Sequence, residues 1–271
     1  MSKKGKVYLV GAGPGDPELL TLKAHRILSK SNVIIYDALV NPAILEFAPC
    51  DVIKVFIGKS RRSDRLSQKS VNNMMIDYAV KGCQVIRLKG GDPFIFGRGG
   101  EEMLALAEAE IAFEIIPGIS AGHAVPAYAD IPLTHRQIAS SVTFVTGHEC
   151  SGKNSSVNWK SLAFSADTLV VFMCVANLTH IVDCLIEAGK CPDTPIAVIE
   201  KGTLLSQKTR TGTLENIIEQ TGSDPVRKPA LAVIGEVVRI REMLGDLKIE
   251  TTVKERAIKT GVMDEVFSCV S

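Results

Sequence analysis

Short apolar segments alternate with amphipathic ones along the first half of the chain. Short runs rich in Val and Ile are typical of buried strands, and longer segments with apolar residues every three or four positions are typical of helices. We therefore expect strands over residues 6–10, 33–36, 52–57, 85–88 and 113–116. Helices are expected over residues 19–29, 67–81 and 101–110. This alternation predicts a mainly parallel sheet.

The second half of the chain predicts a mixed sheet. Its expected strands cover residues 142–146, 168–173, 196–199, 207–213 and 230–234, and a helix is expected over 178–188. The segment IPLTHR, residues 131–136, is a plausible hinge between the two halves. The sequence thus predicts an α/β protein with one domain over 1–134 and a second over 135–245. The polar segment 246–271 is assigned no role.

The composition is that of a globular protein without a charge bias. The chain has 271 residues, 46% of them apolar, with 31 Lys and Arg against 30 Asp and Glu. This balance gives no general reason to expect nucleic acid or an acidic membrane as a partner. The longest apolar run, 169–176, has eight residues, whereas a membrane-spanning helix needs about 20. The first residues are typical of a strand, not of a targeting segment, so we expect a cytoplasmic protein.

The cysteines do not suggest a disulfide framework or a metal site. There are seven of them, an odd number, and no C-x-x-C pair occurs. The five histidines also lack the spacing of metal ligands. We therefore expect reduced thiols and no metal ion.

A first glycine-rich loop, GAGPGDP at residues 11–17, follows the first expected strand. It invites comparison with the dinucleotide signature G-x-G-x-x-G, but Asp16 stands where the third glycine belongs. Pro14 and Pro17 also prevent the turn from running straight into a helix. A nicotinamide-dependent oxidoreductase is therefore a weaker interpretation. Three glycines in five residues still allow the backbone to approach a ligand closely.

Two further loops follow later strands. The segment LKGGDPFIFGRGGEE, 88–102, has five glycines within eleven residues. In it Asp92 could accept hydrogen bonds from a ribose or an amine, and Arg98 and Glu101 are one helical turn apart. The segment PGISAG, 117–122, also offers small residues. Ligands gather at the carboxyl ends of strands in open α/β sheets, where all three loops are expected. The alternative for each loop is a surface turn without a ligand.

Seven segments in a fixed order resemble one enzyme family. They extend from Val7 to about Arg241 and read VYLVGAGPGDPELLTLKA, YDALV, RLKGGDPFIFGRGGEE, PGISA, IPLTHR with VTGH, MCVAN and PALAVIG. Together they resemble the uroporphyrinogen-III C-methyltransferases of the precorrin and tetrapyrrole methyltransferase family. Much of the pattern is shared with other precorrin methyltransferases, but GGDPFIFGRGGEE together with IPLTHR resembles the uroporphyrinogen enzymes most.

The resemblance implies a fold and a cofactor. It implies the two-domain tetrapyrrole methylase fold, usually a homodimer, with S-adenosylmethionine in the cleft between the domains. Cys174 departs from the family, which often has glycine there, and its side chain could narrow the cofactor pocket. The implied cofactor contacts are Pro14, Gly90, Gly91, Asp92, Ile95, Ser120 and Ala121 in the first domain, and Met173, Gly202 and Ala230 in the second.

The resemblance also implies which residues handle protons and charge. Asp37 would be the proton acceptor and Lys59 the proton donor, with Arg98 a rival for the proton-handling role. Glu101 and Arg136, together with Arg98, are the implied substrate-side charges. Each residue also has a purely structural interpretation. Asp37 could begin a turn, and Lys59 could be an ordinary surface lysine.

The implied reaction suits these residue types. Uroporphyrinogen III is an electron-rich macrocycle with eight carboxylates, which arginine can grip through paired hydrogen bonds. The family methylates it at C2 and C7 to give precorrin-2, a precursor of sirohaem and cobalamin, and leaves S-adenosylhomocysteine. The segment 54–69 carries six basic residues against one acid, Asp64, and would help to attract such a substrate. The alternatives are a later precorrin as substrate and a non-catalytic binding module.

Overall fold

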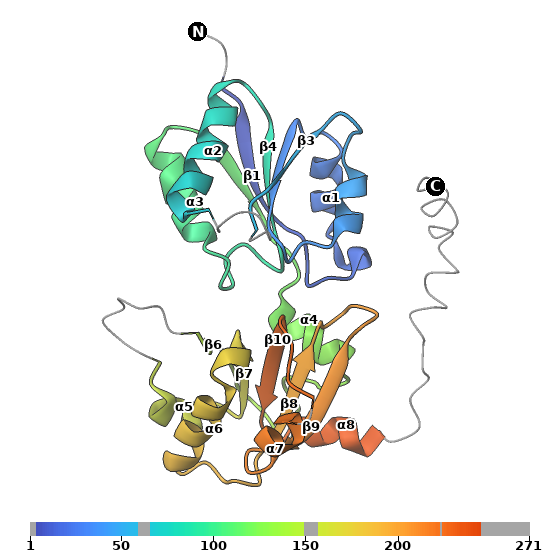
Figure 1. Cartoon of the computed structure of the whole chain (residues 1–271), viewed down its shortest axis with the longest axis vertical. Coiled ribbons are helices and arrows are strands. Elements are labelled where there is room, and N and C mark those ends of the chain that lie inside the picture. The colour runs from blue at the N-terminus through green and yellow to red at the C-terminus, as the bar shows by residue number, and fades with distance from the viewer. Residues whose placement is uncertain (1–3, 59–65, 149–156, 223, 245–271) are drawn as a thin grey trace.

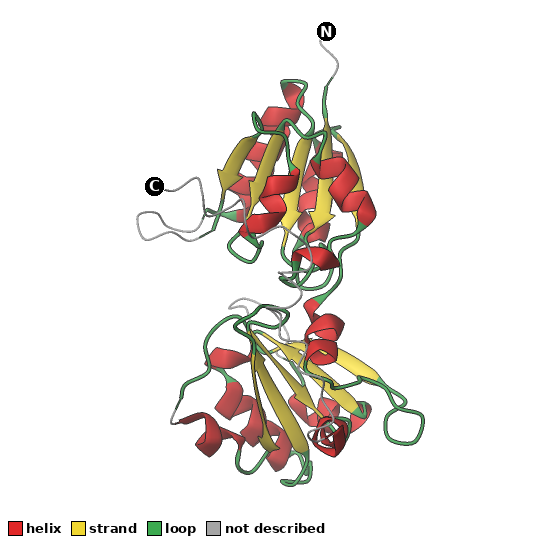
Figure 2. Cartoon of the chain, turned by 90° about the vertical axis from the view of Figure 1, so that its right-hand side faces the viewer, coloured by secondary structure: helices red, strands yellow, loops and turns green. Residues whose placement is uncertain are grey.

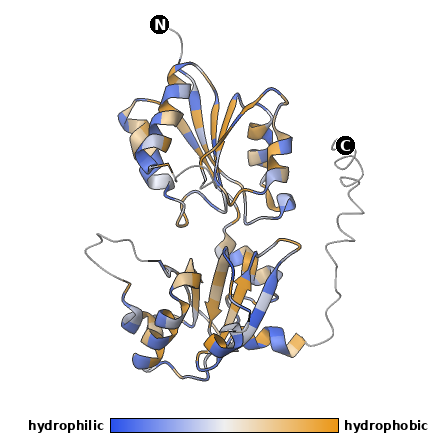
Figure 3. Cartoon of the chain, in the orientation of Figure 1, coloured by the Kyte–Doolittle hydropathy of each residue, from blue (hydrophilic) through white to orange (hydrophobic). Residues whose placement is uncertain are grey.

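The computed structural model describes residues 4–58, 66–148, 157–222 and 224–244. In these residues the chain forms two α/β domains that follow one another along the long axis of the molecule (Figure 1). Each domain has a five-stranded sheet with helices on its two sides (Figure 2). The hydrophobic residues concentrate on the strands of both sheets (Figure 3).

The first domain is built on a fully parallel sheet with the strand order β3-β2-β4-β1-β5. Its strands are β1 (Lys6–Gly11), β2 (Val33–Tyr36), β3 (Ile53–Phe56), β4 (Val85–Lys89) and β5 (Ala112–Ile116). Its helices are α1 (Leu22–Leu28), α2 (Gln68–Val80) and α3 (Gly99–Glu108), with the short 3₁₀ helices η1 (Pro17–Leu19) and η2 (Pro42–Phe47).

Both faces of this first sheet are covered, which explains its continuous apolar strands. Leu9 of β1 packs in a cluster with Met75 of α2 and Leu106 of α3. The next residue, Val10, belongs to the cluster on the other face, with Leu28 of α1. Successive side chains of a strand point to opposite faces, so a sheet covered on both sides needs apolar residues at consecutive positions.

The second domain has a mixed sheet with the strand order β6-β7-β10-β8-β9. Strands β6 and β7 are parallel, and the other pairs are antiparallel. The strands are β6 (Val142–Thr146), β7 (Thr168–Phe172), β8 (Pro195–Glu200), β9 (Lys208–Thr213) and β10 (Ala230–Ile234). The helices are α4 (Ala121–Tyr128), η3 (Cys174–Ala176), α5 (Trp159–Ser165), α6 (Leu178–Glu187), α7 (Ile217–Gly222) and α8 (Val238–Leu244).

Different helices cover the two faces of the second sheet. One core cluster brings Trp159 of α5, Leu185 of α6 and Ile217 of α7 onto the sheet. The opposite cluster contains Val125 of α4 and Val238 of α8. Helix α4 thus packs against the second sheet, although the chain reaches it directly from β5 of the first. The domain division at residue 134 stays a prediction.

The predicted architecture is confirmed, because every expected strand forms and the sheets are parallel and mixed as expected. Four helices were missed. Helix α4 contains Pro126 and few large apolar residues, and α5, α7 and α8 have only seven, six and seven residues, too few to show a helical period. The helix expected over 19–29 was wrong at its start. The Thr21 hydroxyl accepts a hydrogen bond from Ala24 N at 3.2 Å, so α1 begins only at Leu22.

Two further findings concern the described residues alone. Of the cysteines that lie in them, Cys50, Cys83, Cys174 and Cys191 are free thiols, and Cys184 Sγ lies 3.6 Å from His180 Nε2. None of the helices in the described ranges has both the length and the apolar character needed to cross a membrane.

Glu114 of β5 ties three elements of the first domain together. Its carboxylate pairs at 2.6 Å with Lys6 Nζ of β1 and at 2.6 Å with Lys23 Nζ of α1. Hydrogen bonds from Lys23 and Lys6 lower the pKa of Glu114 from 4.5 to about 2. Ion pairs of this kind stabilise the fold only while the carboxylate is ionised.

We predict that Glu114→Gln lowers the free energy of unfolding at neutral pH by at most about 1 kcal/mol, because these partly exposed pairs are screened by water. A depressed pKa in the folded state gives stability that is complete above the unfolded-state pKa and is lost as the pH falls toward about 2. Urea unfolding of both proteins at stepwise lower pH should show their stabilities converging below pH 4.5. A difference that stays constant with pH would contradict this role for Glu114.

Candidate functional site

Most of the candidate residues that the structure describes lie where the edges of the two sheets face each other. Arg136 does not, because it follows Leu133, whose carbonyl oxygen accepts a hydrogen bond at 2.9 Å from Thr168 Oγ1 at the start of β7, the opposite edge of the second sheet. All strands of the first sheet are parallel, and β5 leads directly to α4, so the carboxyl edge of this sheet faces the second domain (Figure 1). In the second sheet, β10 runs antiparallel to both β7 and β8. The ends of β7 and β8 and the start of β10 therefore share one edge. The topology therefore places residues from both domains at the two sheet edges that face each other.

Glycines bring the three loops of the first domain into backbone contact. Gly11 ends β1, Gly91 follows β4 and Gly118 follows β5. A Cβ atom at Gly11 would lie 2.5 Å from Cα of Gly118, and one at Gly118 would lie 2.6 Å from Cα of Gly11. Gly13 N donates to Gly91 O at 3.2 Å, and Gly91 N donates to Gly13 O at 2.6 Å. The loops can meet this closely only because Gly11 and Gly118 carry no side chains.

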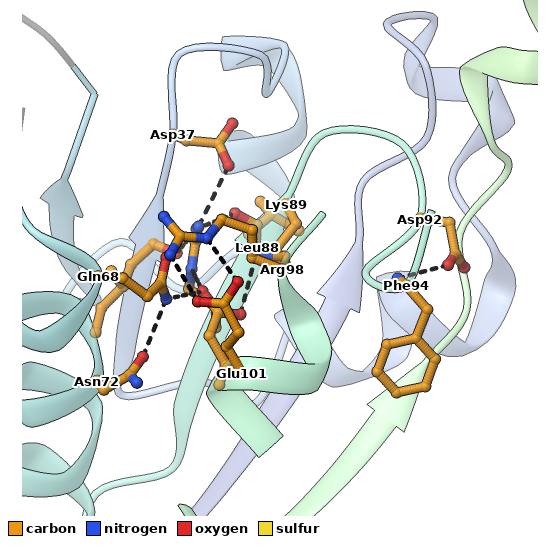
Figure 4. A network of polar contacts seen from close by, with 12 residues as sticks. Asp37, Gln68, Asn72, Leu88, Lys89, Asp92, Phe94, Arg98 and Glu101 are labelled. Atoms are coloured by element: carbon orange, nitrogen blue, oxygen red, sulfur yellow. Dashed lines mark hydrogen bonds and ion pairs between the residues drawn. The ribbon is translucent and has the colours of Figure 1, made fainter. Parts of the chain in front are cut away.

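Asp92 fastens the second loop to the third. Its Oδ1 accepts a hydrogen bond from Phe94 N at 2.8 Å (Figure 4), and its Oδ2 accepts one from Gly118 N at 3.0 Å. The carboxylate therefore already has a structural role. A hydrogen bond from a ligand would use its remaining lone pairs.

Two glycines, Gly90 and Gly91, directly precede Asp92, so the backbone there carries no side chains. Gly90 lies against the turn after β2, where a Cβ would be 2.6 Å from Cβ of Leu39. Gly91 has a φ of +71°, and the nearest described atom to a Cβ there is Ala121 N at 3.8 Å. Ser120 caps the start of α4 through its hydroxyl. The structure thus brings Gly90, Gly91, Ser120 and Ala121 together.

Three candidates of the second domain lie at its facing edge. Met173 follows β7 in the left-handed region and is half-exposed. Gly202 follows β8, and a Cβ there would overlap the side chain of Val125 in α4. Ala230 begins β10 and pairs with Glu200 at the end of β8. The mixed sheet therefore collects residues that are distant in sequence.

Hydrogen bonds join the first loop to the second domain. Asp16 N donates to Thr203 Oγ1 at 3.1 Å, and the hydroxyl of Tyr128 donates to Asp16 Oδ2 at 2.8 Å. Asp16 is two residues beyond Pro14, and Thr203 is the neighbour of Gly202. These contacts therefore hold the first glycine loop beside the Gly202 segment.

An aromatic contact joins the second loop to the second domain. The rings of Phe96 and Phe172, the last residue of β7, lie 4.8 Å apart between centroids. The adjacent Ile95 is exposed. Candidate residues of the second loop thus lie near the end of β7, where Met173 is found.

The substrate-side candidates are exposed. Arg98 and Glu101 share a face as their spacing predicts, with Nε to Oε1 at 3.0 Å and Nη2 to Oε2 at 2.6 Å. The hydrogen bond from Arg98 lowers the pKa of Glu101. Arg136 is exposed between α4 and β6. Lys59 lies outside the described residues, as does much of the basic segment 54–69.

Cys174 belongs to the core of the second domain. Its side chain is fully buried in the cluster that contains Val145, Trp159 and Ile181. Burial raises the pKa of the Cys174 thiol to about 12. The residue that departs from the family pattern is therefore a neutral packing residue, whereas its neighbour Met173 is half-exposed.

Beneath Asp37 lies a group of charges that sequence reasoning did not single out. Arg87 and Lys89 of β4 are only 5% and 3% exposed, and Glu102 of α3 is fully buried. Glu102 accepts hydrogen bonds from Arg87 Nε at 3.0 Å and from Lys89 Nζ at 2.9 Å. Arg87 Nη2 lies 3.4 Å from Asp37 Oδ2 (Figure 4). Burial and the nearby Arg87 lower the pKa of Lys89.

A signal for this group exists in the sequence. Strand β4 reads VIRLK, in which two cations stand two residues apart and so point to the same face. Charges on one face of a buried strand need a counterion, and the run GGEE offers one where α3 crosses that face.

Comparison with known proteins identifies the family. The family described as Tetrapyrrole (Corrin/Porphyrin) Methylases matches residues 6–218. The chain belongs to this family. Its members among known proteins include both free-standing enzymes and parts of longer ones.

An S-adenosyl-L-methionine-dependent uroporphyrinogen III methyltransferase from Methanosarcina barkeri is 48% identical over 243 residues, which cover 89% of this chain and 95% of that protein. A siroheme synthase from Acinetobacter baylyi is 49% identical over 89% of this chain but 52% of that protein, so the chain spans about half of that relative. The crystal structure of uroporphyrin-III C-methyl transferase from Thermus thermophilus complexed with S-adenyl homocysteine has a TM-score of 0.75 at 38% identity, over 87% of this chain and 100% of that one. The predicted tetrapyrrole methylase fold is confirmed.

We predict that Gly118→Ala destabilises the protein by about 1–3 kcal/mol, because its methyl group must displace the backbone of a neighbouring loop. The matched control is Gly222→Ala in α7, where no described atom lies within 4 Å of a Cβ. The control should change the free energy of unfolding by less than about 1 kcal/mol. Urea unfolding of the two variants measures the difference, and equal stabilities would show that the glycine contact is not tight.

Proposed function

We propose that this chain uses S-adenosylmethionine to methylate uroporphyrinogen III at C2 and C7, giving precorrin-2 for sirohaem or cobalamin synthesis. The observation that carries the proposal is the convergence of three glycine loops with the facing edge of the second domain. This convergence occurs in a chain that matches a uroporphyrinogen III methyltransferase along 95% of that protein's length.

The residues at the convergence fit the cofactor. The bare backbone at Gly91 leaves room beside Ala121 N, because a Cβ there would come no closer to it than 3.8 Å. Backbone N–H and C=O groups at such loops can hold an adenosine and an amino-acid tail by hydrogen bonds. In this proposal the residues before 134 that contact the cofactor are Pro14, Gly90, Gly91, Asp92, Ile95, Ser120 and Ala121, and those after it are Met173, Gly202 and Ala230. S-adenosylmethionine supplies the transferable methyl group and leaves as S-adenosylhomocysteine.

Methyl transfer from a sulfonium centre depends on how the reacting atoms are aligned. Within the described ranges, no three His, Cys, Asp or Glu side chains lie together as a metal site would require. The chain's part in methyl transfer is alignment, holding the nucleophilic ring carbon in line with the methyl group. Rigid loops serve that task well.

Charged side chains have the remaining roles. Arg98 and Arg136 are exposed cations that can pair with substrate carboxylates, and Glu101 holds the Arg98 guanidinium in a fixed orientation. After methyl transfer a ring proton must leave, and Asp37 accepts it. Lys59 is the proposed proton donor, and Arg98 is the alternative residue for proton handling.

The proposal predicts a gain of two methyl groups. Uroporphyrinogen III is incubated anaerobically with the purified chain and S-adenosylmethionine, and the product is analysed by mass. A tetrapyrrole that gains no methyl group, in the presence of folded protein, would overturn the proposal. Methylation of a later precorrin but not of uroporphyrinogen III would favour the alternative substrate.

A binding titration separates the methyltransferase from a nicotinamide-dependent oxidoreductase. We expect saturable binding of S-adenosylhomocysteine and no saturable binding of NAD. The reverse result would favour the oxidoreductase. Binding of S-adenosylhomocysteine without any turnover would favour a non-catalytic binding module.

We predict that Arg136→Ala raises KM for the tetrapyrrole about tenfold, because one charge-assisted contact with a carboxylate contributes about 1.5 kcal/mol or more. The affinity for S-adenosylhomocysteine should stay unchanged. Arg26→Ala, an exposed arginine on α1, is the matched control and should leave KM as it is. An unchanged KM in Arg136→Ala would remove this residue from the substrate site.

The proposal includes a homodimer that works in the cytoplasm, with a domain division near residue 134. The support for the dimer is the family resemblance alone. Light scattering of the purified chain measures its mass in solution. A monomer that is fully active would correct this part of the proposal.

A further inference from the structure

The buried charges Arg87, Lys89 and Glu102 stand in an unusual place for a parallel sheet. Strand β4 lies between β2 and β1, and Arg87 pairs in register with Ile35 on one side and Leu9 on the other. Its neighbours along the strand, Ile86 and Leu88, are fully buried apolar residues. Replacing a buried ion pair with apolar residues of similar size is often neutral or stabilising. Stability alone therefore does not explain why charges occupy this position.

The contacts of Arg87 suggest what the charges do. Its Nε donates to Glu102 Oε1 at 3.0 Å, and its Nη1 donates to Leu88 O at 2.9 Å. These bonds fix the plane of the guanidinium group and leave Nη2 facing Asp37 Oδ2 at 3.4 Å. The other oxygen of Asp37 accepts a hydrogen bond from Leu39 N at 3.0 Å. Both oxygens of the proposed proton acceptor are thereby oriented.

Glu102 is the centre of this arrangement. Its Oε1 also accepts a hydrogen bond from Gln68 Nε2 at 3.2 Å, and its Oε2 accepts one from Lys89 Nζ at 2.9 Å. The carboxylate is thus held by donors from α2 and β4 together. Its neighbour Glu101 is exposed and pairs with Arg98 instead. The two adjacent acids of the GGEE run therefore serve different partners.

We propose that Glu102 is a positioning residue for Asp37, acting through Arg87 and without touching the substrate. The proposal rests on the proposed function, in which Asp37 accepts a proton from the methylated ring. Lys89 completes the arrangement by neutralising the second oxygen of Glu102. Without the Glu102 carboxylate, the Arg87 guanidinium loses its charge-assisted bond at Nε and is held only through Nη1, by Leu88 O at 2.9 Å and Ile35 O at 3.4 Å, so its Nη2 is less firmly directed toward Asp37.

A double-mutant cycle tests this role. Glu102→Gln, Asp37→Asn and the double variant are assayed for methyl transfer to uroporphyrinogen III with a methyl-labelled cofactor, so that slow rates can be measured. We expect Glu102→Gln to lower kcat at least tenfold in the native background and less than twofold when Asp37 is already Asn. KM for S-adenosylmethionine should be unchanged. Glu108→Gln, the same change at an exposed position of α3, is the control.

The outcomes separate the hypotheses. Equal losses of kcat in both backgrounds would mean that Glu102 acts only on the general structure, and this overturns the proposal. An unchanged kcat in Glu102→Gln, or in Asp37→Asn, overturns it as well. If the unaltered chain does not methylate uroporphyrinogen III, the proposed function fails first, and the positioning role fails with it.

A second variant, Arg87→Lys, tests the proposal even if Glu102→Gln does not fold. Arg87→Lys keeps the buried charge, but its single ammonium group cannot bond Glu102 and face Asp37 in the geometry of the guanidinium fork. Folding of each variant is checked by near-UV circular dichroism and S-adenosylhomocysteine titration. In a second double-mutant cycle, Arg87→Lys should lower kcat strongly in the native background and much less when Asp37 is already Asn. Additive losses in folded Arg87→Lys would overturn the proposal on their own.

Discussion

The candidate site depends on the packing of bare backbone at Gly11, Gly91 and Gly118. Strand β1 lies between β4 and β5 in the sheet, so the loops that follow these three strands leave from adjacent positions at one edge. A Cβ atom at Gly11 or at Gly118 would overlap the backbone of the neighbouring loop. Because the glycines let the loops touch, Asp92 of the second loop can accept a hydrogen bond from the backbone of the third. The result is a short, rigid strip of backbone at the carboxyl edge of a parallel sheet, where a ligand can approach N–H and C=O groups directly.

The strand pattern of the sequence predicted most of this fold, because the described strands other than β9 contain apolar residues that are buried or, in β3 at the end of its sheet, partly buried, and so form a visible apolar run; β9, with the sequence KTRTGT, is the polar exception. The glycine loops were also visible, because each one directly follows an expected strand, although a glycine-rich surface turn would have the same composition. What periodicity could not predict was helix α4, whose residues are small and interrupted by Pro126. Nor could it predict which side chains of the second domain come together. Met173, Gly202 and Ala230 share an edge because β10 runs antiparallel to β7 and β8, and the sequence pattern predicted a mixed sheet without showing which of its strands are antiparallel.

The buried charges were missed for a different reason. A strand such as VIRLK resembles an apolar strand with two polar defects, and the usual expectation is that Arg and Lys lie at the surface. The structure instead compensates both cations with one carboxylate from α3, which is possible only because this helix crosses the same face of the sheet. Local sequence rules fail at this point, and such failures are expected where residues are retained for function and not for stability.

The two domains contact each other at two separate places, one polar and one aromatic. The polar contacts centre on Thr203, whose N–H donates to Gln207 Oε1 at 2.7 Å while Gln207 Nε2 donates to Tyr128 O at 3.0 Å. The bond from Asp16 N to Thr203 Oγ1 then links these residues to the first glycine loop. The aromatic contact of Phe96 with Phe172 lies at the second loop. The hydrogen bond and the aromatic contact therefore join the facing edges at two separate places. Residues such as Met173 and Ile95 consequently stay exposed beside the contacts, where they are accessible to a bound molecule.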